Sequence, residues 1–158
     1  ETDELPVRKW SQQDADFVGA ELELRYDIGH FESGHWWLFG LFDYVDAELD
    51  DGSNVPLMPP MRFGGGFDWH FGNWQANLTW IHADDVTDVA EYETPTPGYD
   101  LLNADISWHL PTSGQSDWEL FLKGHNLLDE DIRNSASYLK DQAPQIGRNF
   151  TVGVRLAY

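Results

Sequence analysis

Strict alternation of side-chain type near the C-terminal end of this chain constrains its fold more than any other feature. Between positions 149 and 158 every second side chain is apolar: Phe150, Val152, Val154, Leu156 and Tyr158. The residues between them are small or polar. Successive side chains of a β-strand point to opposite faces, so this pattern predicts a strand with one apolar face. A helix would need a period near 3.6, which these residues do not follow.

The same period of two recurs upstream, in segments 18–28, 62–71, 73–80 and 102–110. Two further segments are less regular. Residues 117–127 alternate except that Phe121 falls on the polar side, and residues 35–47 are apolar on both faces apart from Asp43. We therefore predict an all-β chain of seven strands, with residues 5–10 as a candidate end of an eighth.

Composition leaves both soluble and membrane barrels open but excludes other classes. No run of residues approaches the roughly 20 apolar positions of a membrane-spanning helix, while barrel strands alternate and keep a low mean hydropathy. The formal net charge of −19 excludes nucleic acid as a partner, because phosphate binding requires clustered Lys and Arg. The absence of cysteine fits an envelope protein that has no disulfides.

The connections between the predicted strands alternate in length. Shorter ones at 30–34, 70–73 and 111–117 alternate with long ones at 48–61, 84–98 and 128–147. Outer-membrane barrels have short periplasmic turns and long extracellular loops. We therefore expect residues 17–158 to form transmembrane strands with the long loops outside, and residues 1–16 to be an extracellular loop or the end of a preceding strand.

Aromatic residues gather near both ends of the predicted strands, as expected for rings that prefer the two membrane–water interfaces. Near the shorter connections lie Tyr26, Trp36, Trp69, Trp74, Trp108, Trp118 and Tyr158, and near the long ones lie Phe42, Tyr44, Phe63, Trp80 and Phe150. A soluble, lipocalin-like carrier with its apolar row inside has less reason to place Trp at both ends. The pattern favours an antiparallel transmembrane β-barrel, either part of a larger one or a self-contained barrel of eight strands completed by residues 1–12.

Several short motifs resemble the C-terminal region of TonB-dependent outer-membrane receptors. They are the run 93–99 (ETPTPGY) followed by Leu101-Leu-Asn103, the run 126–129 (NLLD), and the runs 137–140 (SYLK), 143–144 (AP) and 147–150 (GRNF). Together they span about residues 56–158. The family usually ends in Phe, whereas this chain ends in Tyr158. A terminal aromatic on an apolar row is similar to the signal read by the outer-membrane insertion machinery.

The resemblance implies active import across the outer membrane of a Gram-negative bacterium. Family members form a barrel of about 22 strands with a plugged lumen, and the plug contacts the TonB complex. We expect the plug to lie outside these 158 residues. The implied ligand is a scarce metal or metal chelate, with zinc considered first, because receptors with this kind of C-terminus include zinc-uptake members, and siderophore iron next. The implied surroundings are the lipid bilayer and lipopolysaccharide.

No catalytic motif stands out, and we expect no enzymatic activity.

The acidic residues Asp84, Asp85, Asp88, Glu91 and Glu93 fall in one long loop, where they are candidates to hold a divalent cation such as calcium or zinc. The alternative is a solvated loop, cross-bridged to lipopolysaccharide by divalent ions. The basic residues Arg133, Lys140 and Arg148 are too sparse to indicate a siderophore pocket. The run 64–66 (GGG) is expected to serve close packing or bending of a strand.

Overall fold

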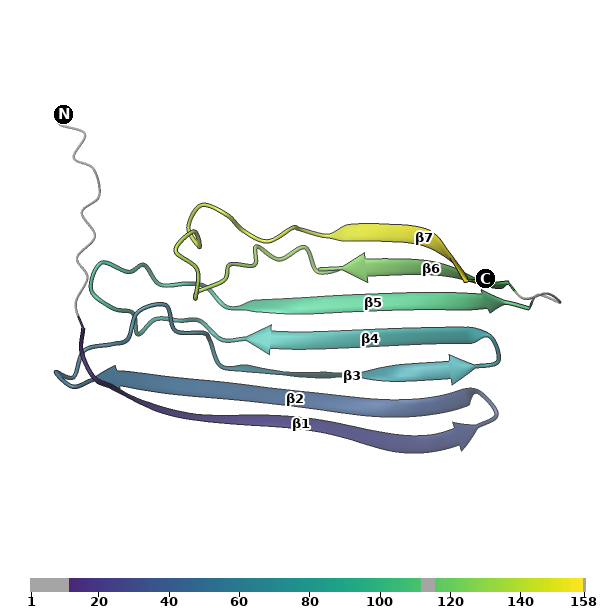
Figure 1. Ribbon diagram of the computed structural model, residues 1–158, viewed down its shortest axis with the longest axis horizontal. Coiled ribbons are helices and arrows are strands. Elements are labelled where there is room, and N and C mark those ends of the chain that lie inside the picture. Colours follow the sequence, from purple (N-terminus) through teal and green to yellow (C-terminus); the bar gives the residue numbers. More distant parts are fainter. Residues whose placement is uncertain (1–11, 112–115, 158) are drawn as a thin grey trace, which may run out of the picture.

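The computed structural model describes residues 12–111 and 116–157, which form a single antiparallel sheet of seven strands in chain order (Figure 1). The strands are β1 (Ala15–Phe31), β2 (Gly34–Leu49), β3 (Arg62–Phe71), β4 (Trp74–Ala83), β5 (Tyr99–Leu110), β6 (Asp117–His125) and β7 (Asn149–Ala157). The all-β prediction and its seven strands are confirmed for these residues. The candidate eighth strand at 5–10 lies outside the described residues, as does Tyr158. Within the described part of the chain, no helix is long and apolar enough to cross a membrane.

The connections divide the sheet into two unlike ends (Figure 1). At one end, which we call the turn end, neighbouring strands are joined by residues 32–33 and 72–73. The connection 111–116 belongs to the same end, and its residues 112–115 lie outside the described residues. At the other, the loop end, lie three long connections: loop A (50–61), loop B (84–98) and loop C (126–148). The predicted alternation of lengths is therefore present.

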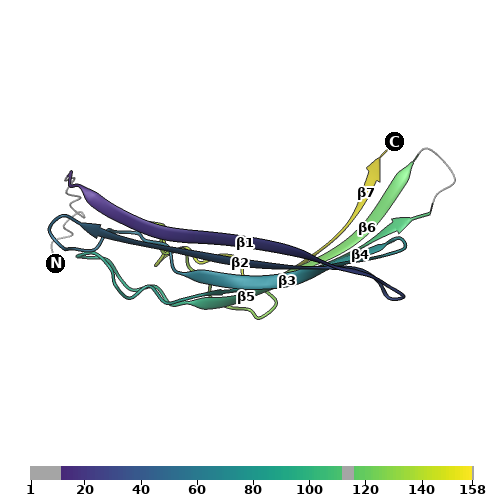
Figure 2. The ribbon, with the colours of Figure 1, turned by 90° about the horizontal axis from the view of Figure 1, so that it is seen from below.

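The two faces of the sheet differ as the alternation predicts. On one face apolar side chains pair across strands, as where Leu120 of β6 opposes Val154 of β7. On the other face polar residues pair, and Asp105 opposes Lys123. Val152 is 82% exposed on the apolar face. Contiguous exposed apolar surface of this kind marks a membrane or protein contact, and the sheet bows along its length rather than lying flat (Figure 2).

The structure decides the register of β2, whose sequence is apolar on both faces. Trp36 and Leu38 share the apolar face, whereas Trp37 and Phe39 lie on the polar one. Phe39 has room there because its partner on β3 is Gly66, where a Cβ atom would lie 2.7 Å from Cζ of Phe39. The glycines of β3 thus serve close packing, as predicted from the sequence.

Glycine is also required at the β1–β2 turn. Gly34 has a φ of 117°, and a Cβ atom there would lie 2.7 Å from Nε1 of Trp69. That indole nitrogen donates a hydrogen bond to the carbonyl oxygen of Ser33 at 2.6 Å. The Trp69 ring therefore fills the space in which a side chain at position 34 would lie, and only glycine fits there.

Candidate functional site

Burial is concentrated at the loop end of the molecule, not in the middle of the sheet. The side chains that the fold buries most fully are Ala83, Thr96, Asn126, Ile132, Ser135 and Lys140. Ala83 is the last residue of β4, and the others belong to loops B and C. An open sheet one layer thick has no interior of its own, so the long loops pack on one another and build the small core instead.

Asn126 anchors loop C to the sheet. Its backbone N–H donates to Oδ1 of Asn103 on β5 at 3.0 Å. Its side chain donates from Nδ2 to the carbonyl oxygen of Glu130 at 2.9 Å and accepts from the N–H of Glu130 at 3.0 Å. The backbone of Asn126 has a φ of 50°, which asparagine tolerates better than most residues. Asn103 and Asn126 come from two of the motifs that carry the resemblance described above.

Loop C also joins the other two loops. The hydroxyl of Ser135 donates to the carbonyl oxygen of Met58 in loop A at 2.8 Å. The ammonium group of Lys140, which is 4% exposed, donates to Oγ1 of Thr94 at 2.9 Å and Oγ1 of Thr96 at 3.0 Å, as well as to the carbonyl oxygen of Thr94. These bonds connect positions more than 40 residues apart, so the three loops form one folded unit.

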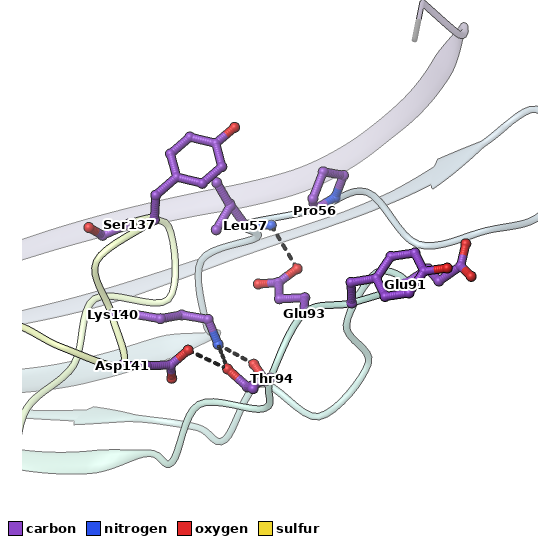
Figure 3. Close-up of a pocket in the computed structure, with 10 residues that line it drawn as sticks. Pro56, Leu57, Glu91, Glu93, Thr94, Ser137, Lys140 and Asp141 are labelled. Carbon is purple, nitrogen blue, oxygen red and sulfur yellow. Dashed lines mark hydrogen bonds between the residues drawn. The ribbon is translucent and has the colours of Figure 1, made fainter. Parts of the chain in front are cut away.

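A cavity of about 380 Å³ lies where the three loops meet (Figure 3). Loop A contributes Pro56 and Leu57, loop B contributes residues 91–94, and loop C contributes Ser137, Tyr138, Lys140 and Asp141. Figure 3 shows the Glu93 carboxylate turned toward loop A, where its Oε2 accepts the N–H of Leu57 at 3.1 Å. The cavity wall is thus held by bonds between loops.

Two residues of the cavity have backbone conformations that are uncommon for residues with side chains. Leu57 has a φ of 61° and Tyr92 a φ of 68°. Such conformations persist only where surrounding contacts impose them, and they gather at ligand-binding sites. Leu57 is fixed by its bond to Glu93, and Tyr92 lies in a turn closed by the N–H of Glu93 on the carbonyl oxygen of Ala90 at 3.0 Å.

The loops carry a strong excess of negative charge. The three basic residues of loops A to C are Arg133, Lys140 and Arg148, and the carboxylates are Asp50, Asp51, Asp84, Asp85, Asp88, Glu91, Glu93, Asp129, Glu130, Asp131 and Asp141. Each basic residue is bonded within the loops: Arg133 to Asp131 at 3.0 Å, Arg148 to Asp129 at 3.2 Å, and Lys140 as described. The surface that remains is therefore acidic.

Hydrogen bonds shift the titration of two exposed loop side chains. The pKa of Asp51 is lowered from its ordinary value, chiefly by the hydrogen bond from the Ser53 hydroxyl and then by the one from the Gln13 amide. The pKa of Tyr92 is raised, chiefly because its hydroxyl is hydrogen-bonded to the Glu91 carboxylate, whose charge acts in the same direction. Glu91 and Tyr92 therefore interact as neighbours at the cavity wall.

The structure disperses the five residues predicted to hold a cation. Asp84 lies 3.2 Å from Nε2 of His82, Asp85 accepts the N–H of Gly98 at 2.5 Å, and Asp88 is exposed. The other two, Glu91 and Glu93, line the cavity. In residues 12–111 and 116–157, no group of three or more His, Asp or Glu side chains is arranged to hold a metal ion. The predicted cation at these residues remains a prediction.

The other predicted residues lie where the alternation placed them. Phe150, Val152, Val154 and Leu156 occupy the exposed apolar face of β7. Tyr26, Trp36, Trp69, Trp74, Trp108 and Trp118 lie toward the turn end of their strands, and Trp80 toward the loop end. At the turn end the rings of Trp74 and Trp108 stack with centroids 5.6 Å apart. Their role at a membrane interface remains a prediction.

Neither Ser135 nor the ammonium of Lys140 was assigned a role from the sequence. Neither residue lies in a periodic segment, and their partners Met58 and Thr94 belong to other loops. The set of motifs pointed to Lys140, which ends the run 137–140, and to Thr94, which lies in the run 93–99, but not to Ser135. A motif marks such residues but does not say that they meet.

A second, polar cavity of about 160 Å³ opens on the polar face of the sheet, over β3 to β7. Asn77 donates to Asp68 at 2.8 Å, and Arg155 is paired with Glu119. Lys123 lies over the ring of Phe121, 5.6 Å from its centroid. The polar face is thus a wall of paired charges and amides, suited to water or to another polar surface.

These features define a section of a large antiparallel barrel, with an apolar outer face and a cap of interlocked loops at one end. A family model described as "TonB dependent receptor-like, beta-barrel" matches residues 8–127, so the chain belongs to the TonB-dependent receptor family, a class of outer-membrane proteins. The solved structure of "Copper transporter OprC" is similar in fold, with a TM-score of 0.75 and 19% sequence identity. That match covers 91% of this chain and 24% of the transporter, so the chain spans about a quarter of its length.

Proposed function

We propose that this chain forms the C-terminal barrel wall of a transporter that imports a scarce metal or metal chelate across the outer membrane of a Gram-negative bacterium. The observation that carries the proposal is the cap of three interlocked loops at one end of a barrel section that belongs to a receptor family. Zinc is the first ligand to consider and siderophore-bound iron the next. The fold that the chain shares with a copper transporter supports a metal as cargo but does not select one.

The proposal includes an orientation. The loop end is extracellular, the turn end periplasmic, the polar face lines the lumen, and the apolar face contacts lipid. Three observations support it: the alternation of connection lengths, the exposure of side chains such as Val152 on the apolar face, and the paired charges of the opposite face. In this orientation the acidic loops meet lipopolysaccharide.

The remaining partners follow from membership of the family. The TonB complex would act through a plug outside these residues, and the outer-membrane insertion machinery would read the apolar row of β7. Such receptors bind and transport ligands, so the chain is proposed to have no enzymatic activity. The polar cavity over β3 to β7 is where the wall would contact whatever fills the lumen.

A self-contained barrel of eight strands is the second candidate, and the intact mass of the native protein distinguishes the two. We expect a mass several times the 18.1 kDa of this chain, because the similar transporter is about four times as long. A native mass near 18.1 kDa would instead establish a complete small barrel and remove the import proposal.

Uptake by whole cells tests the cargo. A strain lacking the gene for the full-length protein is compared with the complemented strain for accumulation of labelled zinc, a ferric siderophore and copper, each with and without a functional TonB complex. We expect zinc accumulation to depend on both the protein and TonB. Dependence for the ferric siderophore alone would replace zinc with iron, and no dependence for any of the three would contradict metal import.

A further inference from the structure

We propose that the cavity between the three loops binds an organic cation that has an apolar body, and that it discriminates against anionic ligands of the same shape. The inference rests on one part of the proposed function, the orientation that makes the loop end extracellular, and not on a metal as the cargo. It goes further by assigning a charge and a chemical class to the ligand that this cavity admits.

The cavity carries an excess of negative charge. Its carboxylates are Glu91, Glu93 and Asp141, against the single ammonium of Lys140. That ammonium is almost wholly buried and is bonded to the oxygen atoms of Thr94 and Thr96. It therefore holds two loops together and is not available to an anionic ligand. Glu93 and Asp141 each use one carboxylate oxygen in a bond between loops, which leaves their second oxygen atoms for a cation.

The basic side chains in the described part of the loops are bonded to other loop atoms. Arg133 donates to the carbonyl oxygen of Lys140 at 2.8 Å as well as to Asp131. Arg148 donates to the carboxylate of Asp129. A site for an anionic chelate needs exposed guanidinium or ammonium groups, and in the described part of the loops all of these groups are committed to internal bonds. The field at the loop end therefore attracts cations.

Part of the cavity wall is apolar and aromatic. Pro56 and Leu57 form one side of the cavity, and Tyr92, which is 96% exposed, and Tyr138 lie in its rim. Tyrosine rings attract organic cations placed over their faces. A hydrated metal ion would gain nothing from these surfaces, and the described residues present no three-ligand group for one. The wall fits a molecule that carries its positive charge on an apolar frame.

Binding of two matched probes to the purified full-length receptor tests the inference. Phenethylammonium and 3-phenylpropionate have similar shape and opposite charge, and saturation-transfer NMR in a neutral detergent reports binding of each. We expect phenethylammonium to bind, with affinity that falls as salt is raised, and phenylpropionate not to bind. Equal binding of the two probes, or no binding of phenethylammonium, would overturn the inference.

Two charge-matched double variants locate the site. Glu93→Gln with Asp141→Asn removes two charges from the cavity, while each new amide oxygen still accepts the bond from Leu57 or Thr94. Asp50→Asn with Asp88→Asn removes two charges from exposed positions that do not line the cavity. We expect the first pair to weaken phenethylammonium binding about fivefold to tenfold and the second pair to have little effect. Equal losses would mean a diffuse field and no site.

The binding assay needs neither TonB nor energy, so its outcome is independent of the uptake experiment. A receptor that imports metal but binds both probes equally, or neither, would overturn this inference and leave the proposed function standing. A receptor that binds phenethylammonium in the cavity but imports none of the metals would contradict the proposed metal import and leave this inference standing.

Discussion

The ring of Phe121 on β6 lies directly over Gly153 on β7, on the polar face of the sheet. A Cβ atom at Gly153 would lie 2.8 Å from Cε1 of that ring. Lys123 and Arg155 flank the same ring with their charged groups 5.6 and 5.9 Å from its centroid. Phe121 therefore packs over Gly153 with two cations near its ring, which explains an aromatic side chain on an otherwise polar row.

Gly153→Ala is expected to destabilise the folded barrel. The added methyl group overlaps the Phe121 ring, and overpacking of this kind costs about 1–3 kcal/mol. The measurement is the urea midpoint for unfolding of the full-length receptor from lipid vesicles. Gly40→Ala is the control, because the nearest atom to a Cβ there is 3.7 Å away. If both variants unfold at the same urea concentration, the contact between Phe121 and Gly153 has no energetic weight.

The two faces of β7 are expected to tolerate charge differently. Val154→Asp places a carboxylate on the face proposed to contact lipid. A Lys or Arg at mid-membrane costs about 2–4 kcal/mol, and an Asp costs less but still opposes assembly. Thr151→Asp places one opposite Lys123 on the polar face. We expect less folded receptor in outer membranes for Val154→Asp and near-normal amounts for Thr151→Asp, measured by heat-modifiable migration in gels. Equal amounts would count against the assignment of the faces.

Labelling of introduced cysteines tests the orientation, and these 158 residues contain no native cysteine. Asp88 in loop B and Asn73 in the β3–β4 turn are both exposed and lie at opposite ends of the sheet. With Asp88→Cys we expect labelling of intact cells by a membrane-impermeant maleimide, and with Asn73→Cys protection until the outer membrane is opened. The opposite pattern would invert the proposed topology.

Acid is expected to weaken the turn that follows β2. Hydrogen bonds from the Ser53 hydroxyl and the Gln13 amide lower the pKa of Asp51 from its ordinary value of 3.8. These bonds therefore stabilise the turn fully at pH values above 3.8, and their contribution is lost as the pH falls through the lowered pKa. Ser53→Ala should move the pKa of Asp51 back toward its ordinary value. NMR titration of ¹³C-labelled aspartate carboxyl groups in the full-length receptor measures this, with Asp88 as an exposed reference. An unchanged titration in Ser53→Ala would rule out Ser53 as the main cause.

Local alternation was sufficient to predict the sheet. A period of two in a strand with one apolar face is a property of neighbouring residues, so segments such as 149–158 and 102–110 could be assigned without knowledge of the fold. Alternation was less useful for β2, because Phe39 on its polar face is accommodated by Gly66 of another strand. The register shift between Asp27 and Gly29 in β1 had no signal in the alternation either.

The contacts between loops A, B and C could not be predicted from local patterns. Its bonds join residues far apart in the chain, such as Lys140 with Thr94 and Ser135 with Met58, and no periodicity relates these positions. The acidic character of the loops was evident from composition, but composition could not show that the carboxylates separate into different environments. Asp85 is used in a backbone bond and Glu93 in a bond between loops, which disperses the predicted cation ligands.

Lys140→Met is expected to weaken the attachment of loop B to loop C. The methionine side chain has similar length but cannot donate, so the oxygen atoms of Thr94 and Thr96 lose a buried partner, at a cost of about 1–3 kcal/mol. The backbone amides of Val86 and Thr96, bonded to each other's carbonyl oxygens at 2.9 and 3.0 Å, report on this part of loop B. Hydrogen exchange of the full-length receptor should show both amides losing about tenfold in protection, which corresponds to about 1.4 kcal/mol. Lys123→Met on the exposed polar face serves as the control and should leave both amides protected. If protection in Lys140→Met matches that control, the buried ammonium does not hold the loops together, and the cavity must be maintained by other bonds between loops, such as those of Glu93, Asp141 and Ser135.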